Sequence, residues 1–370
     1  MGCWLLVIGY SLFAGRCWFY APERMSGPRM RSIASASLLS CVILLASVLA
    51  VSAIEIEQEQ VRLAEMSPEL EKAIDRGLSY LQLSQNADGS WGTHNKVTET
   101  SLAIMAMMVP GHDPLDKLYG QNIDNAITYL LNRAKHHGGY FADETSQALY
   151  QHSFAVLSLA EVWGQSKRPE IGPALKTAVE ILLRSQGPSG GWRYNPRPGG
   201  TDISCTGTAI QGLASAREAG ILVPDHVIHK ALRCMRAHQS DRTGYFNYGH
   251  GAGDGGNPTL YRCGIGPLSL YLLGDRNSVS LRRGLAVLIK QPESVFSSSV
   301  ANFHLAHYYC IQTCYQAGDQ YFNYWYPRIS RSLLSTQSAD GSWGGQGAMP
   351  TALSILTLGV PYRYLPIYQR

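Results

Sequence analysis

A short turn sequence recurs at a regular interval in this chain of 370 residues. The segments QNADGSW, QGPSGGW and QSADGSW share the pattern Gln-x-x-x-Gly-x-Trp, whose members are Gln85, Gly89 and Trp91, then Gln186, Gly190 and Trp192, then Gln337, Gly341 and Trp343. Weaker versions place aromatic residues at Phe141, Phe246 and Phe296, so the six aromatic positions are 50, 51, 54, 50 and 47 residues apart. A period of this length is typical of a repeat protein.

Each repeat contains the patterns of two helices. The segment before a turn is amphipathic, as where Leu70, Ala73, Ile74, Leu78 and Leu81 recur at helical spacing. The segment after a turn, such as residues 101–109, is apolar on nearly every side and must be buried all round. No period-two strand pattern accompanies them. Six outer and six buried inner helices predict an all-α protein, a closed (α/α)6 toroid spanning residues 67–370 as one domain.

The turn itself is predicted to be structural. Its glycine permits the positive φ that ends an outer helix, and its glutamine can bond the loose carbonyls there. Its tryptophan is expected to fill the wedge between neighbouring repeats.

The N-terminal region has the layout of a leader over residues 1–53, followed by a linker over 54–66. Arg29 and Arg31 precede an apolar run that ends in small residues at Ala53, which favours a signal peptide cut after Ala53. The alternative is an uncleaved membrane anchor, because residues 33–54 are about long enough to span a bilayer. Both alternatives predict an exported body that is periplasmic, secreted or membrane-anchored.

Charge argues against a nucleic-acid partner. Outside the leader, 27 basic residues face 26 acidic ones, and no Lys/Arg stripe is present to neutralise phosphates.

The cysteines of the body form no recognisable framework. Five remain after the leader, an odd number without a Cys-x-x-Cys pair, and we expect buried free thiols at Cys205, Cys234, Cys263, Cys310 and Cys314.

The repeats carry a family resemblance. Gln-x-x-x-Gly-x-Trp is the repeat of the squalene-hopene and oxidosqualene cyclases, and the body resembles the prenyltransferase and squalene oxidase repeat group. The segments LYQHSFAVLSLAE, GGWRYNP and PYRYLPIYQR are similar to an exported bacterial subgroup. The resemblance implies a toroid with a central apolar cavity for an isoprenoid or other lipid-like ligand.

The chain departs from those cyclases at the catalytic acid. They protonate an alkene with a D-x-D-D cluster, in which crowded carboxylates keep one acid protonated. At the matching place, GGTDISCTG, Asp202 stands alone. No D-D-x-x-D cluster for diphosphate and magnesium is present either, so the sequence predicts no cofactor and no metal.

Residues at the starts of the inner helices are expected to meet at one end of the ring. These candidate site residues are Glu99, His152, Asp202, Tyr261, Arg262, His304 and His307. Asp202 is the candidate acid, although its place at a helix start equally suits an N-cap. Tyr308 and Tyr309 are expected to line the cavity and to stabilise a cation, and the histidines to be hydrogen-bonded lining residues.

A zinc site is an alternative by resemblance to the protein prenyltransferases, which bind zinc through Asp, Cys and His. Asp202 and Cys205 with His304 or His307 could supply such a set, but the spacing is D-x-x-C where those enzymes have D-x-C.

Three functions therefore stay open. The first is a terpenoid cyclase or prenyltransferase acting on an isoprenoid at the membrane face. The second is a non-catalytic exported toroid that binds a lipid, glycan or protein partner. The third is a carbohydrate-cleaving toroid, for which only Glu99 and Asp202 fall at the expected rim.

Overall fold

The computed structural model describes residues 66–142, 147–250, 259–345 and 347–368, which all belong to one compact unit. The predicted leader lies outside the described residues. Within these ranges the chain forms twelve α-helices and three short 3-10 helices, with an isolated bridge between Gln239 and Phe246 in place of any strand. None of the helices in the described part combines the length and the apolar character needed to cross a membrane.

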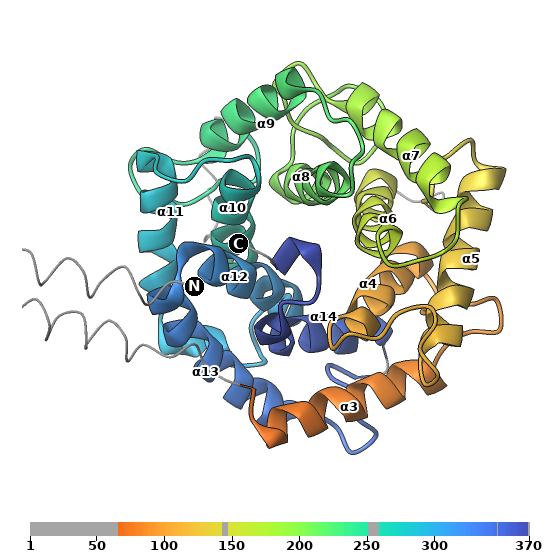
Figure 1. The fold of residues 1–370 in the computed structure, drawn as a ribbon. Helices are drawn as coiled ribbons and strands as arrows, with labels where there is room; N and C mark the ends of the chain where they lie inside the picture. Colours follow the sequence, from red (N-terminus) through yellow and green to blue (C-terminus); the bar gives the residue numbers. More distant parts are fainter. Residues whose placement is uncertain (1–65, 143–146, 251–258, 346, 369–370) are drawn as a thin grey trace, which may run out of the picture. The chain divides into compact units, whose positions relative to one another are not determined.

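The twelve helices alternate between two concentric rings (Figure 1). The outer ring contains α3 (Pro68–Leu83), α5 (Gly120–His136), α7 (Ile171–Ser185), α9 (Asp225–His238), α11 (Val279–Ile289) and α13 (Asp319–Thr336). The inner ring contains α4 (Lys96–Met108), α6 (Ala148–Trp163), α8 (Ile203–Glu218), α10 (Leu260–Leu272), α12 (Phe303–Ala317) and α14 (Ala348–Leu358). Helix α14 contacts α4 and α13 contacts α3, so both rings close. The predicted (α/α)6 toroid is confirmed.

Burial differs between the two rings as the sequence pattern requires. In inner helix α6, every residue from 151 to 162 is buried. In outer helix α9, the buried positions Val227, Ala231, Cys234, Met235 and His238 lie on one face. A helix buried on one side needs only a stripe of apolar residues, whereas one buried on every side needs them all round.

The repeated turns fasten each outer helix to the next. Gly89, Gly190 and Gly341 have φ values of 85°, 92° and 89°, a region that favours glycine. The three turn tryptophans are fully buried, and each indole Nε1 donates to a carbonyl oxygen of the preceding outer helix at 2.8 Å, that of Leu81, Leu182 or Leu333.

The turn glutamines reach further than their own helix ends. Gln85 Nε2 donates to the carbonyl oxygen of Gly89 in its own turn and to that of Asn122 in α5, both at 2.9 Å. Gln186 bonds Gly190 and Val227 in the same way, and Gln337 bonds Gly341 and Ala73. The partner carbonyls therefore belong to the turn and to the next outer helix, because the extended backbone of the cap residue turns the side chain across the wedge.

The chain beyond α14 returns to the ring. It forms η2 (Val360–Tyr362) and η3 (Pro366–Tyr368), and η3 contacts α8. The backbone N–H of Ile367 donates to the carboxylate of Glu161 in α6 at 3.3 Å.

Candidate functional site

The inner helices all begin at one end of the ring, which we call the mouth. Partly exposed side chains in or beside their first turns line it, and these are Glu99, Tyr150, Tyr194, Ser204, Tyr248, Tyr261 and His304. The loops that precede α8 and α10 contribute Tyr194 and Tyr248. Backbone hydrogen bonds hold both loops, because Leu149 N–H donates to the Tyr194 carbonyl at 2.8 Å and Ile203 N–H to the Tyr248 carbonyl at 3.1 Å.

Asp202 is the N-cap of α8. Its Oδ1 accepts the backbone N–H groups of Ser204 and Cys205 at 2.8 and 3.0 Å, and its Oδ2 accepts the Tyr194 hydroxyl at 2.9 Å. The Tyr194 hydroxyl also makes a close hydrogen bond with that of Tyr248. Both oxygens of this fully buried carboxyl group therefore act as acceptors, an arrangement suited to holding a helix start and two tyrosines in place.

Glu99 performs a similar task for a neighbouring helix. Its side chain accepts hydrogen bonds from the backbone N–H groups of Ala348 and Met349, at the start of α14. Burial raises the pKa of the Glu99 carboxyl, and these two hydrogen bonds act in the opposite direction. The two carboxylates predicted at the rim are thus both engaged with helix N-termini.

A column of polar side chains follows the ring axis below the mouth. It lies on one face of α8 at Ser204, Thr208, Gln211 and Ser215. Ser204 bonds the Tyr261 hydroxyl of α10 at 3.1 Å and Thr208 the Tyr309 hydroxyl of α12 at 3.2 Å. Gln211 Nε2 donates to Gln312 Oε1 of α12 at 3.2 Å, and the Ser215 hydroxyl donates to Glu161 of α6.

The middle of the column is closed. Gln211 and Thr208 have no exposed surface, and Tyr308 and Tyr309 expose 1% of theirs. A side chain facing a ligand-sized cavity would keep accessible surface, so the prediction of a central apolar cavity is wrong at this level of the ring. Tyrosine and glutamine side chains fill the space because their polar ends satisfy one another across the axis.

The column was not predicted, although its signal is present in the sequence. Ser204, Thr208, Gln211 and Ser215 recur at helical spacing within an otherwise apolar and glycine-rich segment. Glu161 was missed as well, since a single acid at the end of an apolar helix gives no hint of its partner. Its burial raises the pKa of the carboxyl to about 7.

The remaining predicted residues divide between the mouth and the wedges. His304 Nδ1 bonds the Ser354 hydroxyl at 2.9 Å, and Arg262 Nε donates to Thr259 Oγ1 at 3.0 Å. His152 and His307 are buried and do not join them. His152 bonds the N–H of Phe141 and the carbonyl of Ala178 in α7, so it links the aromatic turn to the next outer helix.

The residues of the alternative zinc set do not gather. In the described part of the chain, the acid, thiol and imidazole groups that come together as a potential metal site are Cys234, His238 and His250. Asp202, Cys205, His304 and His307 form no such group there. All five body cysteines are buried and free, as predicted.

A pocket of about 520 Å³ lies at the opposite end of the ring, where α8, α10 and α12 finish. Ser215, Tyr271, Arg276, Gln316 and Ile367 are among its lining residues, so the returning tail forms one wall.

Solved structures share this fold. An inactive variant of an alpha-1,6-mannanase from Salegentibacter sp. HEL1_6, in complex with alpha-1,6-mannotetrose, matches with a TM-score of 0.61 and 9% identity over 79% of this chain and 98% of that one. The type II terpene cyclase MstE from Scytonema, in complex with geranylgeranyl dihydroxybenzoate, matches with a TM-score of 0.57 and 14% identity over 80% and 98%.

These similarities establish the fold and leave the chemistry to the site. No protein-family model matches the chain, and no curated protein matches it. The cyclase-like toroid is shared with proteins that act on an isoprenoid and on a glycan, so fold alone cannot choose between those ligands.

Proposed function

We propose that the protein is an exported, non-catalytic toroid that binds a glycan at the mouth. The observation that carries the proposal is the state of the two rim carboxylates. Asp202 and Glu99 both accept hydrogen bonds from helix N-termini, which leaves no acid–base pair for hydrolysis. Beside them, tyrosine rings and hydroxyls remain partly exposed, and Tyr248 is 38% exposed.

Tyrosine suits a ligand that is both hydroxylated and ring-shaped. Its ring offers an apolar face, and its hydroxyl donates and accepts hydrogen bonds. Tyr194, Tyr248 and Tyr261 present this combination on two loops and an inner helix. A glycan has matching apolar ring faces and peripheral hydroxyls.

The mannanase supports the ligand class and also the absence of catalysis. That enzyme is inactive when two successive aspartates are replaced. The present sequence contains no two successive aspartates. Binding without cleavage is therefore the function that we propose.

An isoprenoid is the second candidate. The cyclase-type repeats and the likeness to MstE, which binds geranylgeranyl dihydroxybenzoate, favour it. The closed ring axis counts against it, because a polyprene chain would have to displace Tyr308 and Tyr309 from full burial.

Calorimetric titration separates the two candidates. We expect alpha-1,6-mannotetrose or a related oligosaccharide to bind the purified protein unchanged, and Tyr248→Ala to weaken binding at least about tenfold, as for a central aromatic contact. Leu222→Ala, which alters an exposed side chain away from the mouth, is the matched control. Binding or cyclisation of geranylgeranyl dihydroxybenzoate, with no response to any of a panel of oligosaccharides, would overturn the glycan proposal.

A further inference from the structure

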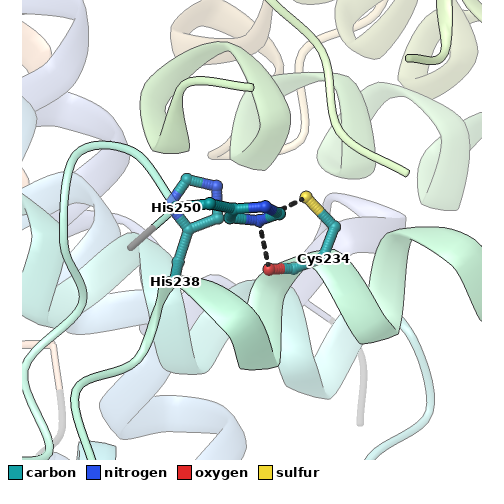
Figure 2. Close-up of side chains that lie close together, drawn as sticks. All are labelled: Cys234, His238 and His250. Carbon is teal, nitrogen blue, oxygen red and sulfur yellow. Dashed lines mark hydrogen bonds between the residues drawn. The ribbon is translucent and has the colours of Figure 1, made fainter. Parts of the chain in front are cut away.

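A cluster of metal-ligating side chains lies between α9 and the loop that follows it (Figure 2). Cys234 and His238 are one helical turn apart on the buried face of α9, and His250 reaches them from the loop. One ligand atom from each of the three residues lies within 4.8 Å of the others. Neither the fold nor the mouth requires this combination of one thiol and two imidazoles.

The spacing of the cluster fits a small tetrahedral ion. Cys234 Sγ lies 3.3 Å from His250 Nε2. Zinc bonds sulfur at about 2.3 Å and imidazole nitrogen at about 2.0–2.1 Å, which places neighbouring ligand atoms of a tetrahedron about 3.3–3.6 Å apart. Small side-chain rotations bring the third ligand atom into the same range.

The orientation of His238 also fits a ligand. Its Nδ1 lies 3.0 Å from the carbonyl oxygen of Asn247. A carbonyl can only accept, so Nδ1 carries the proton and the lone pair of Nε2 points into the cluster. A backbone carbonyl behind the ring in this way is typical of histidines that bind metals.

Thr201 completes the surroundings of the cluster. Its hydroxyl oxygen lies 2.9 Å from His238 Nε2 and 3.4 Å from Cys234 Sγ. Gly191 lies close by, and a Cβ there would stand 2.7 Å from Cys234 Sγ and 2.1 Å from Thr201 Oγ1. The backbone thus leaves room only for the polar groups, with Thr201 beside the fourth position of a tetrahedron.

We infer that Cys234, His238 and His250 form a zinc(II) site, with the fourth position held by water or by the hydroxyl of Thr201. Thiolate and imidazole are the ligands that zinc prefers, and the absence of a carboxylate from this trio disfavours magnesium and calcium. Burial raises the pKa of the Cys234 thiol, so its thiolate form requires a cation close to the sulfur.

The site would fix the mouth without touching a ligand. His250 lies two residues beyond Tyr248, and Thr201 directly precedes Asp202. The metal would therefore tie α9 to both loops that carry the tyrosine pair. This inference stands independently of the glycan proposal, because it rests on the three ligands alone.

Metal analysis of the purified protein tests the site. The protein is loaded with zinc chloride, dialysed against metal-free buffer, and its zinc content is measured per chain. His250 is exposed, so His250→Ala removes a ligand without opening the core, and circular dichroism verifies that it folds. His229→Ala removes an exposed histidine from the same helix and serves as the matched control.

We expect about one zinc per chain in the wild type and in His229→Ala, and a dissociation constant raised at least about tenfold in His250→Ala, the lower end of what even an outer-shell partner contributes. Zinc should also raise the thermal midpoint of the wild type, and of His229→Ala, far more than that of His250→Ala. Equal zinc retention by the wild type and His250→Ala, or no retention by either, would refute the site.

Discussion

Gln337 donates a hydrogen bond from Nε2 to the carbonyl oxygen of Ala73 at 2.8 Å, across 264 positions of sequence. This bond joins the last outer helix to the first. The same wedge is filled by Trp343, whose ring would stand 2.8 Å from a Cβ added at Gly77. The closing wedge is therefore built like the wedges that follow α3 and α7.

Replacing Gln337 by Ala should destabilise the whole ring. The change removes the hydrogen bonds to Ala73 and Gly341 and leaves buried acceptors unpaired, which costs about 1–3 kcal/mol of the free energy of unfolding. Urea titration measures the difference. Gln121→Ala, at an exposed glutamine of α5, should stay within about 0.5 kcal/mol of the wild type. Equal effects of the two changes would contradict a closing role for Gln337.

Replacing a turn tryptophan should cost more. Trp192→Ala leaves a cavity in a fully closed wedge and removes the bond to Leu182, so we expect a loss of about 3–5 kcal/mol. Trp91→Ala and Trp343→Ala should behave alike. Trp192→Phe retains much of the packing and should cost less than Trp192→Ala. A variant that lost ligand binding at unchanged stability would show that the tryptophan acts in the site and not in the wedge.

Glu161 should make stability fall as pH rises. Its pKa is raised from 4.5 to about 7 by burial, so the folded protein holds a proton that the unfolded chain releases. The contribution of Glu161 is complete below about pH 4.5 and is lost as pH rises through 7, by about 3 kcal/mol at most. Glu161→Gln should remove this dependence. Unfolding titrations at pH 4.5, 6 and 7.5 on both proteins provide the comparison, and parallel curves would exclude the effect.

His307 should act in the opposite direction. Its Nδ1 accepts the Trp325 indole N–H at 3.2 Å and its Nε2 donates to the Val295 carbonyl at 3.0 Å. Burial lowers the pKa of His307 from 6.5 to about 4, with a smaller effect from His304. Stability is therefore complete above about pH 6.5 and is lost as pH falls through 4, by about 3 kcal/mol at most.

The matched variant for His307 is His307→Gln, which can make both bonds but cannot be protonated. The stability difference between wild type and variant should shrink or reverse between pH 7 and pH 4. A constant difference would mean that the imidazole does not titrate in this range.

Asp202 offers a direct test of cap against acid. Asp202→Ala should lose about 1–2 kcal/mol, as other cap removals do, whereas Asp202→Asn should stay within about 0.5 kcal/mol because asparagine caps equally well. Ser278→Ala, at the N-cap of α11, gives the reference cost of a cap in this fold. An isoprenoid product formed by the wild type and absent with Asp202→Asn would restore the role of proton donor.

The fold could be predicted because its determinants are local and periodic. The turns beginning at Gln85, Gln186 and Gln337 and the amphipathic or fully apolar segments between them define the helices and their rings. The partners across the axis could not be predicted, because Thr208 meets Tyr309 only after α10 has set their separation. His250 likewise reaches Cys234 through an irregular loop, for which the sequence supplies no register.

Ring closure also limits how such a chain can evolve. An open solenoid can gain or lose one unit at its end, since only one neighbour is affected. Here each of the six helix pairs of the described residues turns the chain by a sixth of a revolution, and the wedge between α13 and α3 is bonded like those after α3 and α7. A seventh unit would require every wedge to change its angle at once. Divergence among proteins of this architecture is therefore expected in the loops at the mouth, while the number of units stays fixed.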